Sequence, residues 1–327
     1  MGDAFIETNA LCIENKEERG GRGVNWVCPL CSNSNDASWE LCIVCDTPKP
    51  AEPEKKPDTD YAYTPPMYLD GMDALNRGAF EVAAQKFMLT AEMLDHAPSQ
   101  NEYGNCLFQG KGVPRDQAEA VKWYEKAANQ GYAPAQYNLG CCHFSGLGVP
   151  KDESAAFYWV QLSYDNGNTK AAYMLATYYF YGHGTEKNVT RALELYKVAA
   201  DNNDPKSAYM VGCCCEKGWG TPRDFTLALE YYTKAADLGY APALNAVGTC
   251  YFLGTGTEKD VYKAVGYFMR SADAGNANGM YNYGFCLERG LGTPKNVEQA
   301  IYWYRLAAEK GHEKAKVSLE RLKEYGS

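Results

Sequence analysis

A 36-residue unit recurs six times without insertion between residues 97 and 312, and this period constrains the fold more than any other feature. Each unit can bury its apolar face only against its neighbours, so a fixed period of this length predicts a stacked solenoid. The estimate of about two globular domains for a chain of this length therefore does not apply. The copies begin at Ala97, Ala133, Thr169, Pro205, Ala241 and Ala277.

Glycines mark the same places in every copy. Two glycines separated by one residue stand near the middle of each copy, and a third glycine closes five of the six, with Asn203 in the remaining place. Glycine and asparagine tolerate a left-handed backbone, so these columns predict loops and helix ends. Each copy is predicted to be a helix A, a GxG loop and a helix B. The residues predicted to cap helix B are Asp116, Asp152, Asn188, Asp224, Asp260 and Asn296.

The composition outside the copies changes along the chain. Residues 1–23 are polar and carry too few apolar residues to order themselves, which predicts a disordered head. Residues 51–66 are rich in proline and charge, which predicts a flexible tether. Residues 67–96 are predicted to form a divergent helical pair that caps the array, and residues 313–327 a C-terminal capping helix.

The net charge of -9 and the pI near 5.1 argue against general binding of nucleic acids or anionic membranes, which requires a basic surface. No segment reaches the roughly 20 apolar residues of a membrane span, and the first residues lack a signal-peptide pattern. We therefore expect a cytoplasmic protein, with the nucleus as the alternative location.

Five of the 13 cysteines share one column of helix A. Packed helices lie about 8–10 Å apart, beyond the roughly 7 Å limit for the Cα atoms of a disulfide. The column therefore predicts buried, reduced thiols, in agreement with a reducing compartment. Its members are Cys106, Cys142, Cys214, Cys250 and Cys286.

Two CxxC pairs, ten residues apart, stand in the segment 24–50. Thiolates from two tight turns supply the tetrahedral ligand set that structural zinc prefers, and four sulfur ligands leave no position for a catalytic water. We expect one structural Zn²⁺ that stabilises a segment too short to build a core. A redox or iron–sulfur site is the alternative. The predicted ligands are Cys28, Cys31, Cys42 and Cys45.

Trp26 precedes the first of these cysteines by two residues, and Asn35 follows the second by four. This pattern resembles the Ran-binding-protein zinc finger family (zf-RanBP), which implies a small finger that binds a partner. Ubiquitin-binding members carry a Thr–aromatic pair where this chain has Ser and Asn, and RNA-binding members carry arginines that this segment lacks. Ubiquitin and a Ran-like protein remain as alternative partners, and RNA is the least favoured. The residues implied as partner contacts are Ser32, Asn33, Trp39 and Val44.

The repeat pattern LG…GxGV…D…A…WY…AA…G resembles the Sel-one-like repeat, a tetratricopeptide-related family. The resemblance implies an all-α, right-handed helix–turn–helix solenoid in which helix A lines a concave groove for a protein or peptide partner. Aromatic rings would supply contact area and amides would pair with a peptide backbone, unless the rings pack between repeats instead. Alignment on the LG pair assigns to the groove Tyr137, Asn138, Phe144, Tyr173, Phe180, Tyr209, Asn245, Phe252, Tyr281 and Asn282.

No catalytic motif competes with this interpretation. The four histidines lack HExxH spacing, and the GxG loops lack the GK[ST] that follows in a phosphate-binding loop. The sequence therefore predicts a non-enzymatic adaptor, in which the array holds one protein and the finger recruits another. A ubiquitin-pathway factor is the alternative, and RNA binding through the finger comes third.

Overall fold

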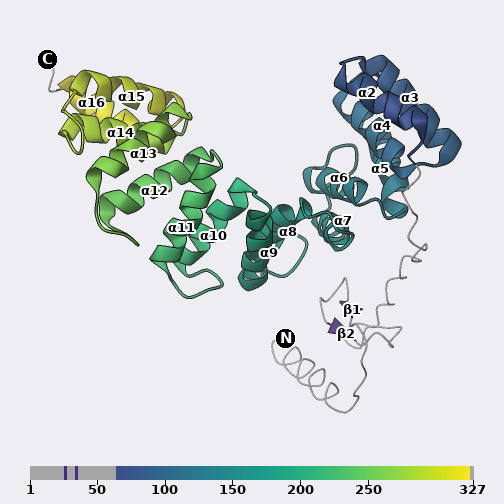
Figure 1. Cartoon of the computed structure of the whole chain (residues 1–327), viewed down its shortest axis with the longest axis horizontal. Helices are drawn as coiled ribbons and strands as arrows, with labels where there is room; N and C mark the ends of the chain where they lie inside the picture. Colours follow the sequence, from purple (N-terminus) through teal and green to yellow (C-terminus); the bar gives the residue numbers. More distant parts are fainter. Residues whose placement is uncertain (1–25, 28–33, 36–63, 325–327) are drawn as a thin grey trace, which may run out of the picture. The chain divides into compact units, whose positions relative to one another are not determined.

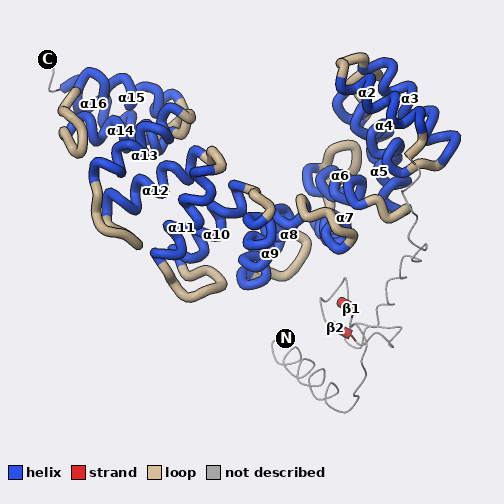
Figure 2. The backbone as a smooth tube through the Cα atoms, in the orientation of Figure 1, coloured by secondary structure: helices blue, strands red, loops and turns tan. Residues whose placement is uncertain are grey.

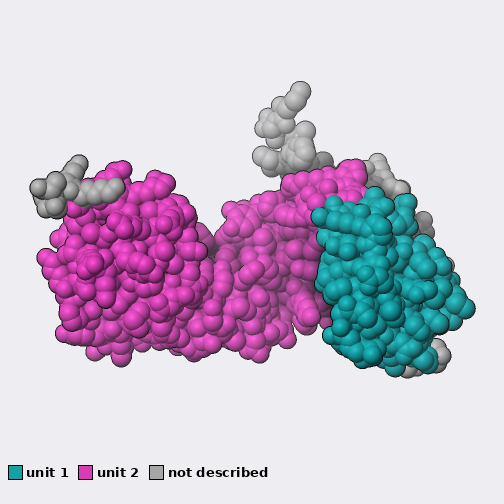
Figure 3. Space-filling view, turned by 90° about the horizontal axis from the view of Figure 1, so that it is seen from above, with its two compact units in different colours: residues 1–132 teal, residues 133–327 magenta. Residues whose placement is uncertain are grey.

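The computed structural model describes residues 26–27, 34–35 and 64–324, of which residues 64–324 form helices joined by short loops (Figures 1 and 2). The chain divides into two compact units, Met1–Tyr132 and Ala133–Ser327, which Figure 3 distinguishes by colour. The predictions for the head, for the four finger cysteines and for the tether as far as residue 63 lie outside the described residues.

The first unit contains the first repeat and the helices before it. Its two short strands pair antiparallel, with Trp26 opposite Asn35 and Val27 opposite Ser34. A small core joins the two helices of the predicted divergent pair to the first repeat through Phe87 and Cys106. The elements are β1 (Trp26–Val27), β2 (Ser34–Asn35), α2 (Pro66–Asn76), α3 (Phe80–Leu94), α4 (Ala97–Gln109) and α5 (Gln117–Asn129).

The second unit contains five repeats and one further helix, and the two helices of each repeat pack against one another. The even-numbered helices from α4 to α14 are the A helices, and the odd-numbered ones from α5 to α15 are the B helices. The elements are α6 (Ala133–Ser145), α7 (Glu153–Asp165), α8 (Ala171–Tyr181), α9 (Val189–Asp201), α10 (Pro205–Lys217), α11 (Phe225–Asp237), α12 (Ala241–Leu253), α13 (Val261–Asp273), α14 (Ala277–Arg289), α15 (Val297–Glu309) and α16 (Glu313–Glu324).

The helices begin and end where the sequence predicts. The six predicted caps each accept a hydrogen bond from a backbone N–H in the first turn of helix B, as Asn296 does from Gln299 at 2.9 Å. The closing residue Asn203 has a φ of 61°, which confirms the left-handed conformation predicted for its column.

The second glycine of a loop pair sets the contact with the preceding repeat at Gly184, Gly220, Gly256 and Gly292. A Cβ on Gly184 would overlap the carbonyl oxygen of Glu153, in the first turn of the preceding helix B. Gly292 stands in the same relation to Val261, where the Cβ would lie 2.6 Å from the carbonyl oxygen. The loop can approach the neighbouring helix this closely only without a side chain, which explains why this column is invariant in the sequence.

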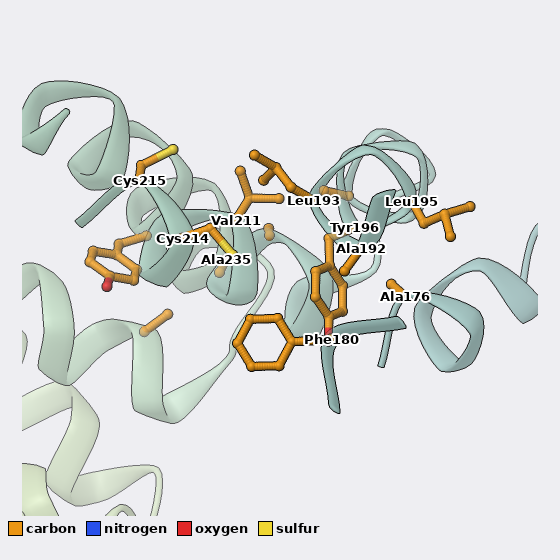
Figure 4. Close-up of a cluster of buried hydrophobic side chains, with 14 of the residues drawn as sticks. Ala176, Phe180, Ala192, Leu193, Leu195, Tyr196, Val211, Cys214, Cys215 and Ala235 are labelled. Carbon is orange, nitrogen blue, oxygen red and sulfur yellow. The ribbon is translucent and has the colours of Figure 1, made fainter. Parts of the chain in front are cut away.

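Small residues on helix B face large ones in the core of the second unit. Ala156, Ala192, Ala228, Ala264 and Ala300 are all buried. Figure 4 shows part of this core, in which the ring of Phe180 lies beside that of Tyr196. Alternation of small and large side chains lets the helices interlock at the density of a protein interior.

All eight cysteines of residues 64–324 are free thiols. The predicted column is buried at each of its five positions, so that prediction is confirmed. Burial raises the pKa of Cys106 to about 11 and that of Cys142 to about 12, so these thiols stay protonated near neutral pH.

Candidate functional site

Three positions of helix A remain half-buried in every repeat of the second unit. They are the fifth, sixth and ninth residues of each 36-residue copy. The sixth and ninth residues follow the fifth by one and four positions, so all three lie on one side of the helix. We call this set the helix-A face. Its members are Tyr137, Asn138, Cys141, Tyr173, Met174, Thr177, Tyr209, Met210, Cys213, Asn245, Ala246, Thr249, Tyr281, Asn282 and Phe285.

Three tyrosines of this face pack on a tyrosine of helix B in their own repeat. The ring centroids of Tyr173 and Tyr196 are 5.9 Å apart. The corresponding distances are 5.4 Å from Tyr209 to Tyr232 and 5.6 Å from Tyr281 to Tyr304. Each ring is thus held on one side by its own repeat and exposes only part of its surface.

The helix-B tyrosines are buried, and helix A supplies a partner for each hydroxyl. Tyr196 Oη lies 3.2 Å from Thr177 Oγ1. Tyr232 donates to Glu216 at 2.7 Å, and Tyr304 donates to Glu288 at 2.9 Å. These bonds explain the glutamates in a column that elsewhere holds phenylalanine.

The predicted groove phenylalanines do not all reach the surface. Phe180 is only 8% exposed, because its ring packs against Tyr196 and against Trp219 at a centroid distance of 5.3 Å, so it belongs to the core. Phe144 and Phe252 are half-buried.

A cation of the following loop covers each of these rings. Lys151, Lys187 and Lys259 place Nζ 5.7, 5.9 and 5.8 Å from the ring centroids of Phe144, Phe180 and Phe252. Each ring is thus shielded by a lysine from its own repeat.

The predicted asparagines lie on the helix-A face. Asn282 Nδ2 donates to Asn245 Oδ1 at 2.8 Å, which links the fifth and sixth repeats through their amides. Asn138 lies half-buried on α6.

The sequence columns also place Met174 and Met210 on this surface, directly after the predicted tyrosines, and the structure has both half-buried there. Phe285, one turn further on, is an apolar residue of this surface that the sequence columns do not predict. At the loop end of helix A, one turn after the ninth residue of the copy and so continuing the helix-A face, Tyr181 is 60% exposed and Leu253 is 64% exposed. The signal for Tyr181 and Leu253 is periodic, because the last residue of helix A is exposed in every repeat of the second unit.

The described residues bring together no group of three or more His, Cys, Asp or Glu side chains that could hold a metal ion. His183 Nδ1 lies 3.1 Å from Glu153 Oε2 in a solvent-accessible pair. None of the helices in residues 64–324 combines the length and the apolar character of a membrane span.

The predicted finger ligands Cys28, Cys31, Cys42 and Cys45 lie outside the described residues. The predicted finger contacts Ser32, Asn33, Trp39 and Val44 lie outside them as well. The part of this segment that the structure describes is the antiparallel pair of β1 and β2.

Solved structures with 29% sequence identity share this architecture. A protective antigen of uropathogenic Escherichia coli with an SLR fold matches 80% of this chain and 56% of its own, with a TM-score of 0.73. A Sel1 repeat protein from Oxalobacter formigenes matches 75% of this chain and 97% of its own, with a TM-score of 0.69. The chain thus spans little more than half the length of the first of these proteins. No curated protein sequence matches the chain.

The family model for the Sel1 repeat matches six consecutive segments, 97–132, 133–168, 169–204, 205–240, 241–276 and 277–312. These boundaries agree with the six copies found in the sequence, and the matched segments cover more than half of the chain. The chain therefore belongs to the Sel1 repeat family.

Proposed function

We propose that this chain is a non-enzymatic adaptor whose repeat array holds a protein partner on the helix-A face. The observation that carries the proposal is the recurrence of half-buried aromatic, thioether and amide groups at the same three positions of five successive repeats. Such side chains offer contact area without the desolvation cost of buried charges.

The packing of the face supports the same function. Tyr173, Tyr209 and Tyr281 are each fixed by a helix-B tyrosine, so they lose little side-chain freedom when a partner binds. Groups that are already ordered make a larger net contribution to affinity than groups that a partner must immobilise.

Retention of proteins from an extract of the source cells by the immobilised full chain tests this proposal. The double variant Tyr181→Ser/Leu253→Ser changes two exposed residues at the ends of A helices, and Tyr158→Ser/Tyr262→Ser changes two exposed residues on B helices as the matched control. We expect the first variant to lose proteins that the wild type and the control retain. Equal retention by all three chains would contradict the proposal.

We further propose that residues 24–50 form a finger around one structural Zn²⁺ held by Cys28, Cys31, Cys42 and Cys45, and that it recruits a second protein. The two CxxC pairs supply the ligand chemistry, and β1 and β2 pair on either side of the first CxxC, as a knuckle requires. The eight free thiols of the array support the expectation of a reducing, cytoplasmic environment.

The metal content of the purified full chain tests the finger. We expect one equivalent of zinc in the wild type and in Cys12→Ser, and its loss in Cys28→Ser/Cys31→Ser. A protein that the finger recruits should be lost by the zinc-free variant and retained by Tyr181→Ser/Leu253→Ser. Zinc in the double cysteine variant, or none in the wild type, would refute the site.

A further inference from the structure

A cavity of about 200 Å³ lies on the helix-A face between α12 and α14. Its walls include Phe252 and Leu253 from α12 and Phe285 from α14, and Phe268 of α13 also lines it. This volume is below the roughly 300–1,000 Å³ typical of small-molecule sites, so it suits a single side chain.

The lining of the cavity also includes the polar residues Thr249, Tyr281 and Asn282, and its helix-B wall is apolar because of one substitution between repeats. Tyr196, Tyr232 and Tyr304 each bring a hydroxyl toward helix A, whereas the equivalent residue here is the buried Phe268. The ring of Phe268 therefore presents no group that needs a hydrogen bond. Leu253 leaves most of its side chain in solvent at the entrance.

Two of the rings that line this cavity each have a cation close by. Lys259 Nζ lies 5.8 Å from the ring centroid of Phe252, and Arg289 Cζ lies 5.9 Å from that of Phe285. Within residues 64–324, Lys259 has no carboxylate at ion-pair distance. Each of these two aromatic walls therefore carries a cation.

Glu288 does not cancel this charge. Its carboxylate is 7% exposed, accepts hydrogen bonds from Arg321 to both oxygens at 2.8 Å, and lies 3.7 Å from Arg289. Because Arg321 already neutralises this carboxylate, the charge of Arg289 remains available to a ligand.

We propose that this cavity binds one apolar side chain of an extended partner peptide in which Asp or Glu flanks that side chain. The carboxylates would meet Lys259 and Arg289, and the apolar side chain would fill the cavity above Phe268. Asn282 uses one N–H to bond Asn245 and makes no other hydrogen bond among the described residues, so its remaining groups can pair with the peptide backbone. This inference rests on the proposed binding function of the helix-A face.

A library of displayed random dodecapeptides tests the proposal. Peptides are selected for binding to the full wild-type chain, and those that also bind the Leu253→Ser variant are removed. We expect enriched sequences that place an aromatic or branched apolar residue beside Asp or Glu. Enrichment of basic sequences, or no enrichment over Leu253→Ser, would overturn the proposal.

Fluorescence anisotropy with the most enriched peptide then tests each contribution. We expect Leu253→Ser and Lys259→Glu/Arg289→Glu each to weaken binding about tenfold, since single interface contacts of this kind contribute that much. Tyr158→Ser is the matched control, because it changes an exposed tyrosine on helix B of an earlier repeat, and it should bind like the wild type. Circular dichroism and thermal unfolding show whether each variant is folded.

The two proposals fail in different ways. If the array retains cellular proteins through its helix-A face but selects no acidic, apolar peptide, only the cavity proposal is lost. If the helix-A variant retains the same proteins as the wild type, the binding function itself is lost.

Discussion

Arg321 Nη2 donates to both carboxylate oxygens of Glu288 at 2.8 Å, and this bond joins the last helix, α16, to helix A of the sixth repeat. Burial raises the pKa of the Glu288 carboxyl, but hydrogen bonds from Arg321 and Tyr304 outweigh it and lower the pKa overall. The carboxylate is therefore ionised at neutral pH. Its largely buried negative charge is stabilised by these two donors.

Removing Arg321 should destabilise the end of the array. Arg321→Ala leaves the largely buried Glu288 with fewer donors, so we expect a loss of about 1–3 kcal/mol in the free energy of unfolding. Lys316→Ala, which breaks an exposed pair with Glu313 on the same helix, should cost less than about 0.5 kcal/mol. Urea unfolding, together with hydrogen exchange of α16, measures the loss of stability in both variants. Equal losses in Arg321→Ala and Lys316→Ala would show that Arg321 does not stabilise the Glu288 carboxylate.

The second glycine of the loop should be far less replaceable than the closing glycine. Gly184 and Gly167 both have positive φ, 65° and 88°, but a Cβ meets backbone only at Gly184. Gly167→Ala should cost about 1 kcal/mol for its backbone conformation. Gly184→Ala adds the overlap with Glu153, so we expect a loss of about 3 kcal/mol or more. Thermal unfolding of the two variants tests this ranking, which similar losses would contradict.

Buried thiols should make stability depend on pH in alkaline solution. The pKa of Cys214 rises from 9.0 to about 12 because of burial, so above about pH 9 the unfolded chain loses the thiol proton while the folded chain keeps it. The unfolded state then binds fewer protons, and the free energy of unfolding falls as pH rises from about 9 toward about 12. Burial also raises the pKa of the buried tyrosines Tyr196 and Tyr232, which act in the same direction.

Cys214→Ala isolates one of these thiols. We expect it to reduce the difference in unfolding free energy between about pH 8 and about pH 10 by about 1 kcal/mol, whatever its cost at pH 8. Cys12→Ala, outside the array, should leave that difference unchanged. The urea midpoint at each pH gives the answer, and an unchanged pH dependence in Cys214→Ala would show that this thiol titrates alike in both states.

The repeat boundaries, loop glycines, helix caps and buried thiols could be predicted from the sequence because each depends on residues close together in one copy. Contacts between helices A and B of one copy could not. The pairing of Tyr232 with Glu216 depends on which side of each helix the residue occupies, and Phe180 is covered by Trp219 of the next repeat. The cavity depends on Phe268, which stands where four of the other five repeats carry a tyrosine and the second repeat carries Val160. This difference matters only once helices α12, α13 and α14 are placed together.

Photocrosslinking is the most direct test of the claim that helix A carries the binding surface. p-Benzoylphenylalanine would replace Tyr181 or Leu253 on the A helices, and Tyr158 or Tyr262 on the B helices, all of which are exposed in the structure. After irradiation in an extract of the source cells, we expect the A-helix positions to link to a shared protein partner and the B-helix positions to give no such product. Crosslinks to that partner from the B-helix positions, with none from the A helices, would contradict the account.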